Sequence, residues 1–449
     1  MTPTRRGHCP GVAHPMSTGD GLLARLMPSS PISLDAFTAL CEASQTHGNG
    51  IMEVTQRGSL QVRGLSPASA TAFARVVSAL EPAERAMLAD EAMPPISTSP
   101  LLGLDPGERV DLRALVPALL GELRNRDDMA SIGPKVSVLI DGGGALHMDE
   151  VPADLRLRAG EGLGLHMSIA GIAKDSTSLG WIELPHAIEA IVRVLSSIAR
   201  RGRDSRAKDF TNDGDAQALR LSLADILSAA PAPAPRRRAE PLGTHRLNDG
   251  TRARGFALPF GYGEAQALRR LTLIAARCGA ASIRPAPGRA LLIIGLQLSA
   301  LDELVAAAIR EKLIVQPDDA RRHVVACAGA PACNSAMLPT RQLAAQVAEA
   351  AGHFLDGSIT IHLSGCTKGC AHRGAAGLTL AGPDRLVVHG RASDAPQGRI
   401  SPADFIAGLR GLRPERDGSL AALLREPQFV SRFGAARPSE PAHGDSGRD

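Results

Sequence analysis

The sequence predicts an α+β fold in which a small α+β unit occurs twice, each time followed by a larger α/β block. Two observations support this. Short stretches with the period-2 alternation of strands are interleaved with amphipathic stretches typical of helices. The element order of residues 20–65 recurs in residues 253–296, at an offset of 231 residues that aligns Gly64 with Gly295. The shared order favours a duplication.

The elements of the two small units correspond one to one. The first unit is predicted to contain a strand at Gly21–Leu26, a helix at Leu34–Thr46, a strand "GIMEVT", a turn "QRGS" and a strand "LQVRGL". The second is predicted to contain a strand "RGFALPF", a helix at Glu264–Cys278, a strand "ASIRP", a turn "APGR" and a strand "ALLIIGL".

A larger block follows each small unit. The first block is predicted to hold a helix at Leu112–Leu123, a strand "KVSVLIDGG" and a helix at Pro185–Ala199. The second is predicted to hold a strand "RHVVACA", a helix at Arg341–Ala351, and strands "SITIHL", "GLTLA" and "RLVVHG". Residues 231–241, "PAPAPRRRAEP", read as a stiff, solvated Pro-rich linker between the halves.

Composition excludes several classes of partner. The chain has 449 residues, a net charge of only +4 and a single Trp, so neither a polyanion-binding field nor a base-stacking surface is expected. We expect no nucleic acid partner. No run of 18 apolar residues occurs and the N-terminus has no apolar signal segment, so we expect a cytoplasmic protein that does not enter a membrane. In the cytoplasm thiols stay reduced, and seven cysteines suggest metal or reactive thiols over disulfides.

Four cysteines form the strongest chemical signal. They are spaced Cys327-x5-Cys333 and Cys366-x3-Cys370, and each pair follows a hydrophobic strand. Four thiolates match the ligand count of a [4Fe–4S] cluster, and the surrounding Gly and Ala residues let the backbone approach one closely. Zinc or plain buried thiols remain alternatives from spacing alone. Cys41 and Cys278 lie on apolar helix faces and are expected in the core, while Cys9 is left open.

These motifs resemble those of sulfite and nitrite reductases. The resemblance rests on the cysteine pattern with "SGCTKGC" and extends through "GDGLLARLMP", "GNGIMEVTQRGSLQVRGL", "TSPLLGLDP" and "GPKVSVLIDGG". It implies duplicated ferredoxin-like half-domains, each paired with a larger sulfite-reductase-like α/β domain. The implied boundaries are 7–80 and 245–315 for the ferredoxin-like units, 81–200 and 316–425 for the larger domains, and 201–244 for the linker. The last domain would carry the cluster loops.

Within that superfamily the chain is most similar to the precorrin-3B synthase branch, through "RRGHCPGVAHPMSTGDGLLARL" and "GCTKGCAH". That resemblance implies an oxidoreductase: a monooxygenase that uses O2 to hydroxylate precorrin-3A, a methylated tetrapyrrole, and closes a lactone in cobalamin biosynthesis. Two departures speak against an anion-reducing centre. Ser137 stands where reductases have a second Lys, and the Arg expected before "TSP" is missing.

The resemblance also assigns roles to individual residues. It implies that Cys327, Cys333, Cys366 and Cys370 hold the cluster. Arg25, Arg57 and Lys135 match family residues that meet an anion or the carboxylates of a tetrapyrrole, which suits a guanidinium because it forks onto a carboxylate. As plain residues, the three cations also read as solvated surface charges. No residue is assigned as catalytic.

The implied cofactor is one [4Fe–4S] cluster. Siroheme is not expected, because the substrate tetrapyrrole would occupy its place, and an additional iron for O2 activation is left open. Neither "DGGGALH" nor "GEGLGLH" fits a dinucleotide-binding motif, so we expect electrons from a separate reductase. The alternatives are a siroheme sulfite or nitrite reductase and a metal-stabilised binding protein without catalysis.

Overall fold

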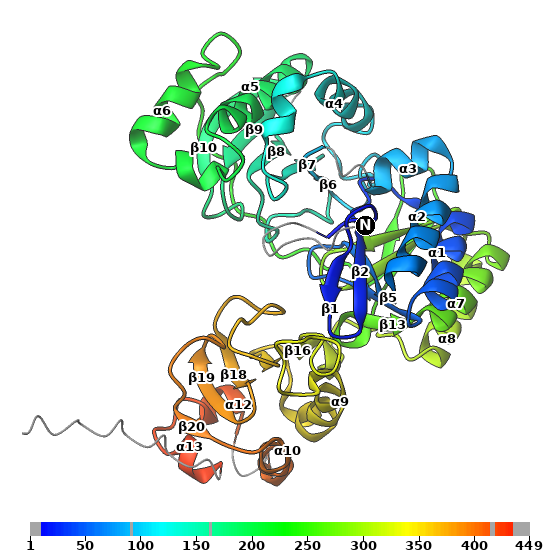
Figure 1. The fold of residues 1–449 in the computed structure, drawn as a ribbon, viewed down its shortest axis with the longest axis vertical. Coiled ribbons are helices and arrows are strands. Elements are labelled where there is room, and N and C mark those ends of the chain that lie inside the picture. Colours follow the sequence, from blue (N-terminus) through cyan, green and yellow to red (C-terminus); the bar gives the residue numbers. More distant parts are fainter. Residues whose placement is uncertain (1–9, 90–92, 161–163, 414–417, 434–449) are drawn as a thin grey trace, which may run out of the picture. The chain divides into compact units, whose positions relative to one another are not determined.

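The computed structural model describes residues 10–89, 93–160, 164–413 and 418–433 (Figure 1). The chain divides into two compact units, which we describe separately. The first extends to residue 17 and continues from 21 to 317; the second contains residues 18–20 and the chain from 318 onward. The α+β fold class is confirmed by four five-stranded sheets and the helices that cover them.

Two small sheets of the first unit exchange strands. One has the order β1-β2-β5-β4-β13 and the other the order β11-β12-β15-β14-β3. Each sheet therefore receives a short strand from the other repeat: β13 pairs with β4, and β3 pairs with β14. The strands of the first repeat are β1 (Met16–Thr18), β2 (Gly21–Leu26), β3 (Ile32–Ser33), β4 (Ile51–Val54) and β5 (Leu60–Leu65). Those of the second are β11 (Gly243–Arg246), β12 (Arg252–Ala257), β13 (Tyr262–Glu264), β14 (Ser282–Ala286) and β15 (Ala290–Leu296).

The predicted duplication is confirmed in detail. Helices α1 (Leu34–His47) and α7 (Ala265–Arg277) pack together, and with α2 (Pro67–Ala79) and α8 (Leu301–Arg310) they gather on one side of the small sheets (Figure 1). Phe37 and Leu268 belong to one continuous buried core. The aligned glycines Gly64 and Gly295 both have positive φ, 72° and 90°, which a side chain would strain.

The two larger sheets also correspond. Each sheet begins with three parallel strands, which are β6, β7 and β8 in one and β16, β17 and β18 in the other. Two further strands then continue the sheet by antiparallel pairing, β9 and β10 in the first and β19 and β20 in the second. The first, in unit one, contains β6 (Ile96–Thr98), β7 (Val138–Asp141), β8 (Leu155–Ala159), β9 (Gly164–Ile169) and β10 (Thr177–Glu183). The second contains β16 (Val324–Ala326), β17 (Ile361–Ser364), β18 (Ala376–Ala381), β19 (Arg385–Gly390) and β20 (Gly398–Arg399). The loops after β16 and β17 carry the cysteines.

The other described helices of the first unit are α3 (Pro82–Ala89), α4 (Leu115–Arg124), α5 (Ala187–Arg200) and α6 (Asp213–Leu221); those of the second unit are α9 (Thr340–Ala351), α10 (Pro402–Gly411), α12 (Leu420–Leu423) and α13 (Phe429–Arg432). Helices α5, α6 and α9 contact the larger sheets, whereas α3 contacts β2 of a small sheet. No helix within the described ranges is long and apolar enough to cross a bilayer. The predicted linker 201–244 includes α6, whose Leu219 is buried against the core, so its extended part is shorter than that range.

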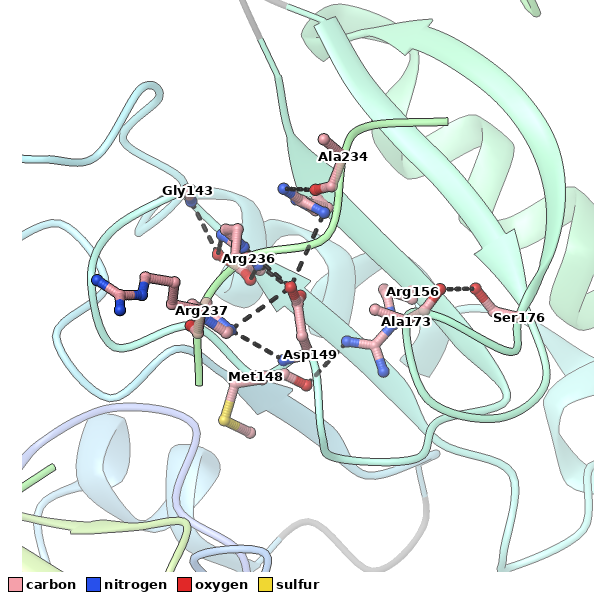
Figure 2. A network of polar contacts seen from close by, with 12 residues as sticks. Gly143, Met148, Asp149, Arg156, Ala173, Ser176, Ala234, Arg236 and Arg237 are labelled. Atoms are coloured by element: carbon pink, nitrogen blue, oxygen red, sulfur yellow. Dashed lines mark hydrogen bonds and ion pairs between the residues drawn. The ribbon is translucent and has the colours of Figure 1, made fainter. Parts of the chain in front are cut away.

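The Pro-rich segment 231–241 has no helix or strand, but one of its arginines is not simply solvated. Arg236 forms an ion pair with Asp149 at 2.6 Å (Figure 2). It forms a second ion pair with Asp141, which is fully buried. Arg158 donates to the carbonyl oxygen of Ala234 at 2.9 Å. Burial raises the pKa of Asp149, but the hydrogen bonds and charge of Arg236 outweigh burial and hold that pKa below its usual value. The segment is thus anchored on the larger sheet of the first unit.

Candidate functional site

The four cysteines lie at one edge of the second unit's sheet. Cys327 directly follows β16, and Cys366 follows β17 after one residue. These strands are parallel neighbours, with Ala326 opposite Leu363, so their carboxyl ends meet at the same edge. The sequence prediction of loops at strand ends is confirmed by this topology.

The sulfur of Cys327 already has a hydrogen-bond donor. The backbone N–H of Gly365 donates to it at 3.2 Å, and the hydroxyl oxygen of Thr340 lies 3.7 Å from it. Thr340 is fully buried and gives its one hydroxyl proton to the carbonyl oxygen of Cys327 at 2.7 Å, so the Gly365 N–H is the donor to the sulfur. Donors aimed at a sulfur stabilise a thiolate, which is the form that binds iron.

The four thiols are close enough to interact electrostatically. Partial burial raises the pKa of Cys370, and Cys366, Cys327 and Cys333 raise it further, while Lys368 lowers it. Lys368 donates to the hydroxyl of Ser335 at 2.8 Å, which joins the two cysteine loops. A shared group that binds all four thiolates relieves this mutual repulsion, and the residues present therefore fit a cluster.

Across the described ranges, no three His, Cys, Asp or Glu side chains are grouped as a single bound ion would require. A cubane cluster takes one thiolate at each iron, so its cysteines surround a cluster-sized space and need not meet at a point.

The other cysteines agree with their predicted roles where the structure describes them. Cys41 is fully buried and Cys278 is 7% exposed, both in the shared core of the small units. Burial raises the pKa of Cys41 to about 12, which leaves an inert thiol. Cys9 lies outside the described residues.

The three predicted substrate cations belong to the first unit. Arg25 lies on β2, opposite Gln61 of β5. Arg57 is exposed in the turn between β4 and β5, and Lys135 is exposed in the loop before β7. They come from two different sheets of that unit, and their assignment to substrate stays a prediction.

Ser137, which stands at the position of the second Lys of the reductase motif, belongs to a hydrogen-bond network around Asp154. Its backbone N–H donates to Asp154 at 3.0 Å, and its hydroxyl donates to the same oxygen at 3.3 Å. Arg206 completes the network with hydrogen bonds of 2.9 and 2.6 Å to the Asp154 carboxylate. This position therefore stabilises the fold of the first unit and supplies no cation.

Sequence reasoning missed Thr340 as a neighbour of the Cys327 sulfur, because the two lie 13 residues apart in the chain, whereas Gly365 is one of the glycines expected to let the backbone approach a cluster. It also missed Arg284 of β14, which is 3% exposed. Arg284 aligns with Glu53 at the offset of 231 residues, and this reversal of charge on a predicted strand was the available signal.

Comparison with known proteins gives the family. The chain is 36% identical over 449 residues to a precorrin-3B synthase from Sinorhizobium sp., an alignment that covers 97% of this chain and 94% of the relative. The chain belongs to the precorrin-3B synthase family. Its relationship to the ferredoxin–nitrite reductase of Synechococcus elongatus is weaker, at 23% identity over 94% of this chain and 88% of that protein. No protein-family profile matches.

The fold agrees with that assignment. The structure of the Mycobacterium tuberculosis NirA protein superposes with a TM-score of 0.71 over 87% of this chain and 79% of that one, at 19% sequence identity. As a member of the precorrin-3B synthase family the chain is an enzyme, and the prediction of that branch over a siroheme reductase is confirmed.

Proposed function

We propose that this chain acts as a precorrin-3B synthase: with O2 it hydroxylates precorrin-3A and closes a lactone, in the aerobic route to cobalamin. One observation carries the proposal, the 36% identity to a precorrin-3B synthase over nearly the whole of both chains. One oxygen atom of O2 enters the product, and the other leaves as water with two electrons and two protons from a separate reductase. Lactone closure joins a substrate carboxylate to the ring without further redox change.

We assign the four cysteines Cys327, Cys333, Cys366 and Cys370 to a [4Fe–4S] cluster. The likeness to nitrite reductases and the grouping of the four thiols at one sheet edge support this assignment. When bound, such a cluster supplies single-electron transfer. The chain's own contribution is to hold the four cysteines at one sheet edge, and the Gly365 N–H stabilises the thiolate of Cys327.

We assign Arg25, Arg57 and Lys135 to the carboxylate arms of the substrate. A substrate with many carboxylates loses part of its hydration on entry, and fixed cations offset that cost. Ser137 donates to Asp154 and supplies no cation, which supports a tetrapyrrole over a small anion as the substrate. Sulfite or nitrite needs several convergent cations at one point. The cytoplasm, where thiolate ligands stay reduced, is the proposed location.

Anaerobic purification followed by absorption spectroscopy and analysis of iron, sulfide and zinc tests this function. We expect iron and sulfide at about four each per chain, with iron–sulfur absorption and no siroheme bands. Zinc as the bound metal would contradict the cluster. Stoichiometric siroheme with turnover of sulfite or nitrite would contradict the proposed reaction.

A further inference from the structure

Arg284 is a buried arginine at a junction inside the first unit. It lies on β14 and is 3% exposed. Its Nη1 donates to the carbonyl oxygens of Pro28 and Ser30 at 2.6 and 2.7 Å. Its Nη2 donates to the hydroxyl of Thr98 at 2.8 Å. In the described part of the chain its Nε–H is buried without a hydrogen-bond partner.

The charge of Arg284 has no acidic partner among the described residues. Burial alone lowers its pKa, to about 9, so the group remains a cation at neutral pH. Arg156 of β8 is the contrasting case. It is equally buried, at 3% exposed, and also donates to carbonyl oxygens, but the charges of Asp149 and Asp141 partly offset the effect of burial on its pKa. A buried cation without a counter-charge is costly unless an anion joins it.

The ion pair found at the corresponding position of the first repeat is absent from the second repeat. Glu53, at the aligned position of the first repeat, forms an ion pair with Arg63 at 3.5 Å. The position that aligns with Arg63 is Ile294, on β15. The second repeat therefore carries the opposite charge at this point and has no charged group at the position of the partner.

Arg284 lines a small pocket with Arg57. The pocket holds about 20 Å³, and its lining also includes the hydroxyl residues Ser59, Ser97 and Thr98. No acidic side chain contributes to it in the described part of the chain. A space of this size takes one water or one carboxylate oxygen, and it excludes a tetrapyrrole ring.

We propose that this pocket is a subsite for one carboxylate arm of the tetrapyrrole substrate, with Arg284 as its buried cation and Arg57 at its exposed side. The inference rests on the proposed function and adds Arg284 to the binding residues. One carboxylate oxygen would enter the pocket, where the positive charge of Arg284 offsets the negative charge of the carboxylate. The other oxygen would face Arg57. A carboxylate suits two guanidinium groups because each presents donors in a planar fork.

The test is binding of precorrin-3A by the full chain under anaerobic conditions without reductant, so that no turnover occurs. Arg284→Gln should weaken binding by about tenfold or more, since the buried positive charge opposite the carboxylate is lost. Arg156→Gln controls for loss of a buried arginine that binds carbonyl oxygens, and it should change binding by less than about threefold.

A second pair of variants leaves Arg284 and its carbonyl contacts in place. Ser59→Asp adds a carboxylate to the pocket that competes with the substrate, whereas Ser59→Asn adds a neutral group of the same shape. We expect Ser59→Asp to bind precorrin-3A at least about tenfold more weakly than Ser59→Asn. The two Ser59 variants test the proposed subsite even if Arg284→Gln does not fold.

Equal binding by Ser59→Asp and Ser59→Asn would overturn the subsite and leave a pocket for water only. Unchanged binding by a folded Arg284→Gln would overturn it as well. If the wild-type chain does not bind precorrin-3A at all, the proposed function itself fails, and the subsite fails with it.

Discussion

The backbone N–H of Gly365 donates a hydrogen bond to the sulfur of Cys327 at 3.2 Å, although 38 residues separate the two in the chain. The contact links the loop after β16 to the loop after β17, and each loop carries two of the four cysteines. The geometry depends on the absence of a side chain at residue 365. A Cβ there would lie 2.5 Å from the Cβ of Ala336 and 3.6 Å from the sulfur of Cys327.

Gly365→Ala should therefore lower the iron and sulfide content of the purified chain, because the two loops must move apart to accommodate the methyl group. Gly352→Ala is the matched control in the same unit, since its Cβ would meet only Ala320 at an ordinary 3.8 Å. Iron and sulfide analysis of the two variants checks the prediction. Equal cluster content in both would show that the close approach at Gly365 does not matter.

Replacing a single ligand cysteine should have a larger effect. Cys327→Ser should remove most of the iron and sulfide, since a cubane with one missing thiolate is exposed and easily lost. Cys41→Ala removes a buried thiol far from this role and should leave both contents unchanged. Full iron in Cys327→Ser would refute the assignment of that cysteine.

The ion pairs that Arg236 of the Pro-rich segment forms with the larger sheet should make the free energy of unfolding depend on pH. Arg236→Met removes the ion pair of the fully buried Asp141 and leaves Asp149 with its longer pair with Arg158 at 3.8 Å. We expect the free energy of unfolding to fall by about 3 kcal/mol at neutral pH. In the wild type Arg236 depresses the pKa of Asp149, so this stabilisation is present above the unfolded pKa and is lost as pH falls. The difference in the free energy of unfolding between the two proteins should therefore persist down to about pH 4 and narrow as the pH falls below it.

Urea unfolding at several pH values measures that difference. Arg193→Met is the control, because it breaks the exposed pair of Arg193 with Asp225 and should cost much less. A difference that stays constant from pH 7 down to about pH 2 would mean that Arg236 stabilises the segment by packing alone.

Glu108 should affect the free energy of unfolding in the opposite direction, by lowering it as the pH rises. Burial raises the pKa of its carboxyl to about 8, above its value in the unfolded chain, while the Gly103 N–H lowers it by a smaller amount. The folded state thus keeps a proton that the unfolded state releases, and stability is lost as pH rises from the unfolded pKa to about 8. Glu108→Gln should remove this loss, so the variant should be the more stable protein at pH 8 and close to the wild type at pH 5. Thermal unfolding at the two pH values checks it, and parallel curves would contradict it.

Much of the fold follows from local pattern. The strands at Gly21–Leu26, Leu60–Leu65, Ala290–Leu296 and Arg385–Gly390 have the predicted bounds, because alternation and flanking glycines mark both ends. The exchange of β3 and β13 between the repeats could not be predicted. Each is at most three residues long, and its partner lies more than 200 residues away.

The candidate site also has a part that the sequence predicts and a part that it does not. The cysteine spacing points to the ligands, since the chemistry requires four thiolates at loop positions. The contacts that complete the site are non-local: Gly365 with Cys327, Arg284 with Pro28, and Arg236 with Asp141. Arg236 in particular lies in a segment whose composition predicts only solvation, and its buried partners appear only once the sheet edge is formed.

The proposed reaction transfers one oxygen atom from O2 to a tetrapyrrole. The most direct test supplies the purified enzyme with precorrin-3A, a chemical reductant and ¹⁸O2, and measures the mass of the product. We expect a product one oxygen atom heavier than precorrin-3A, with the added atom from ¹⁸O2 and none from H2¹⁸O in the converse experiment. An added oxygen that comes from water, or no oxygenated product from a chain that carries its cluster, would contradict it.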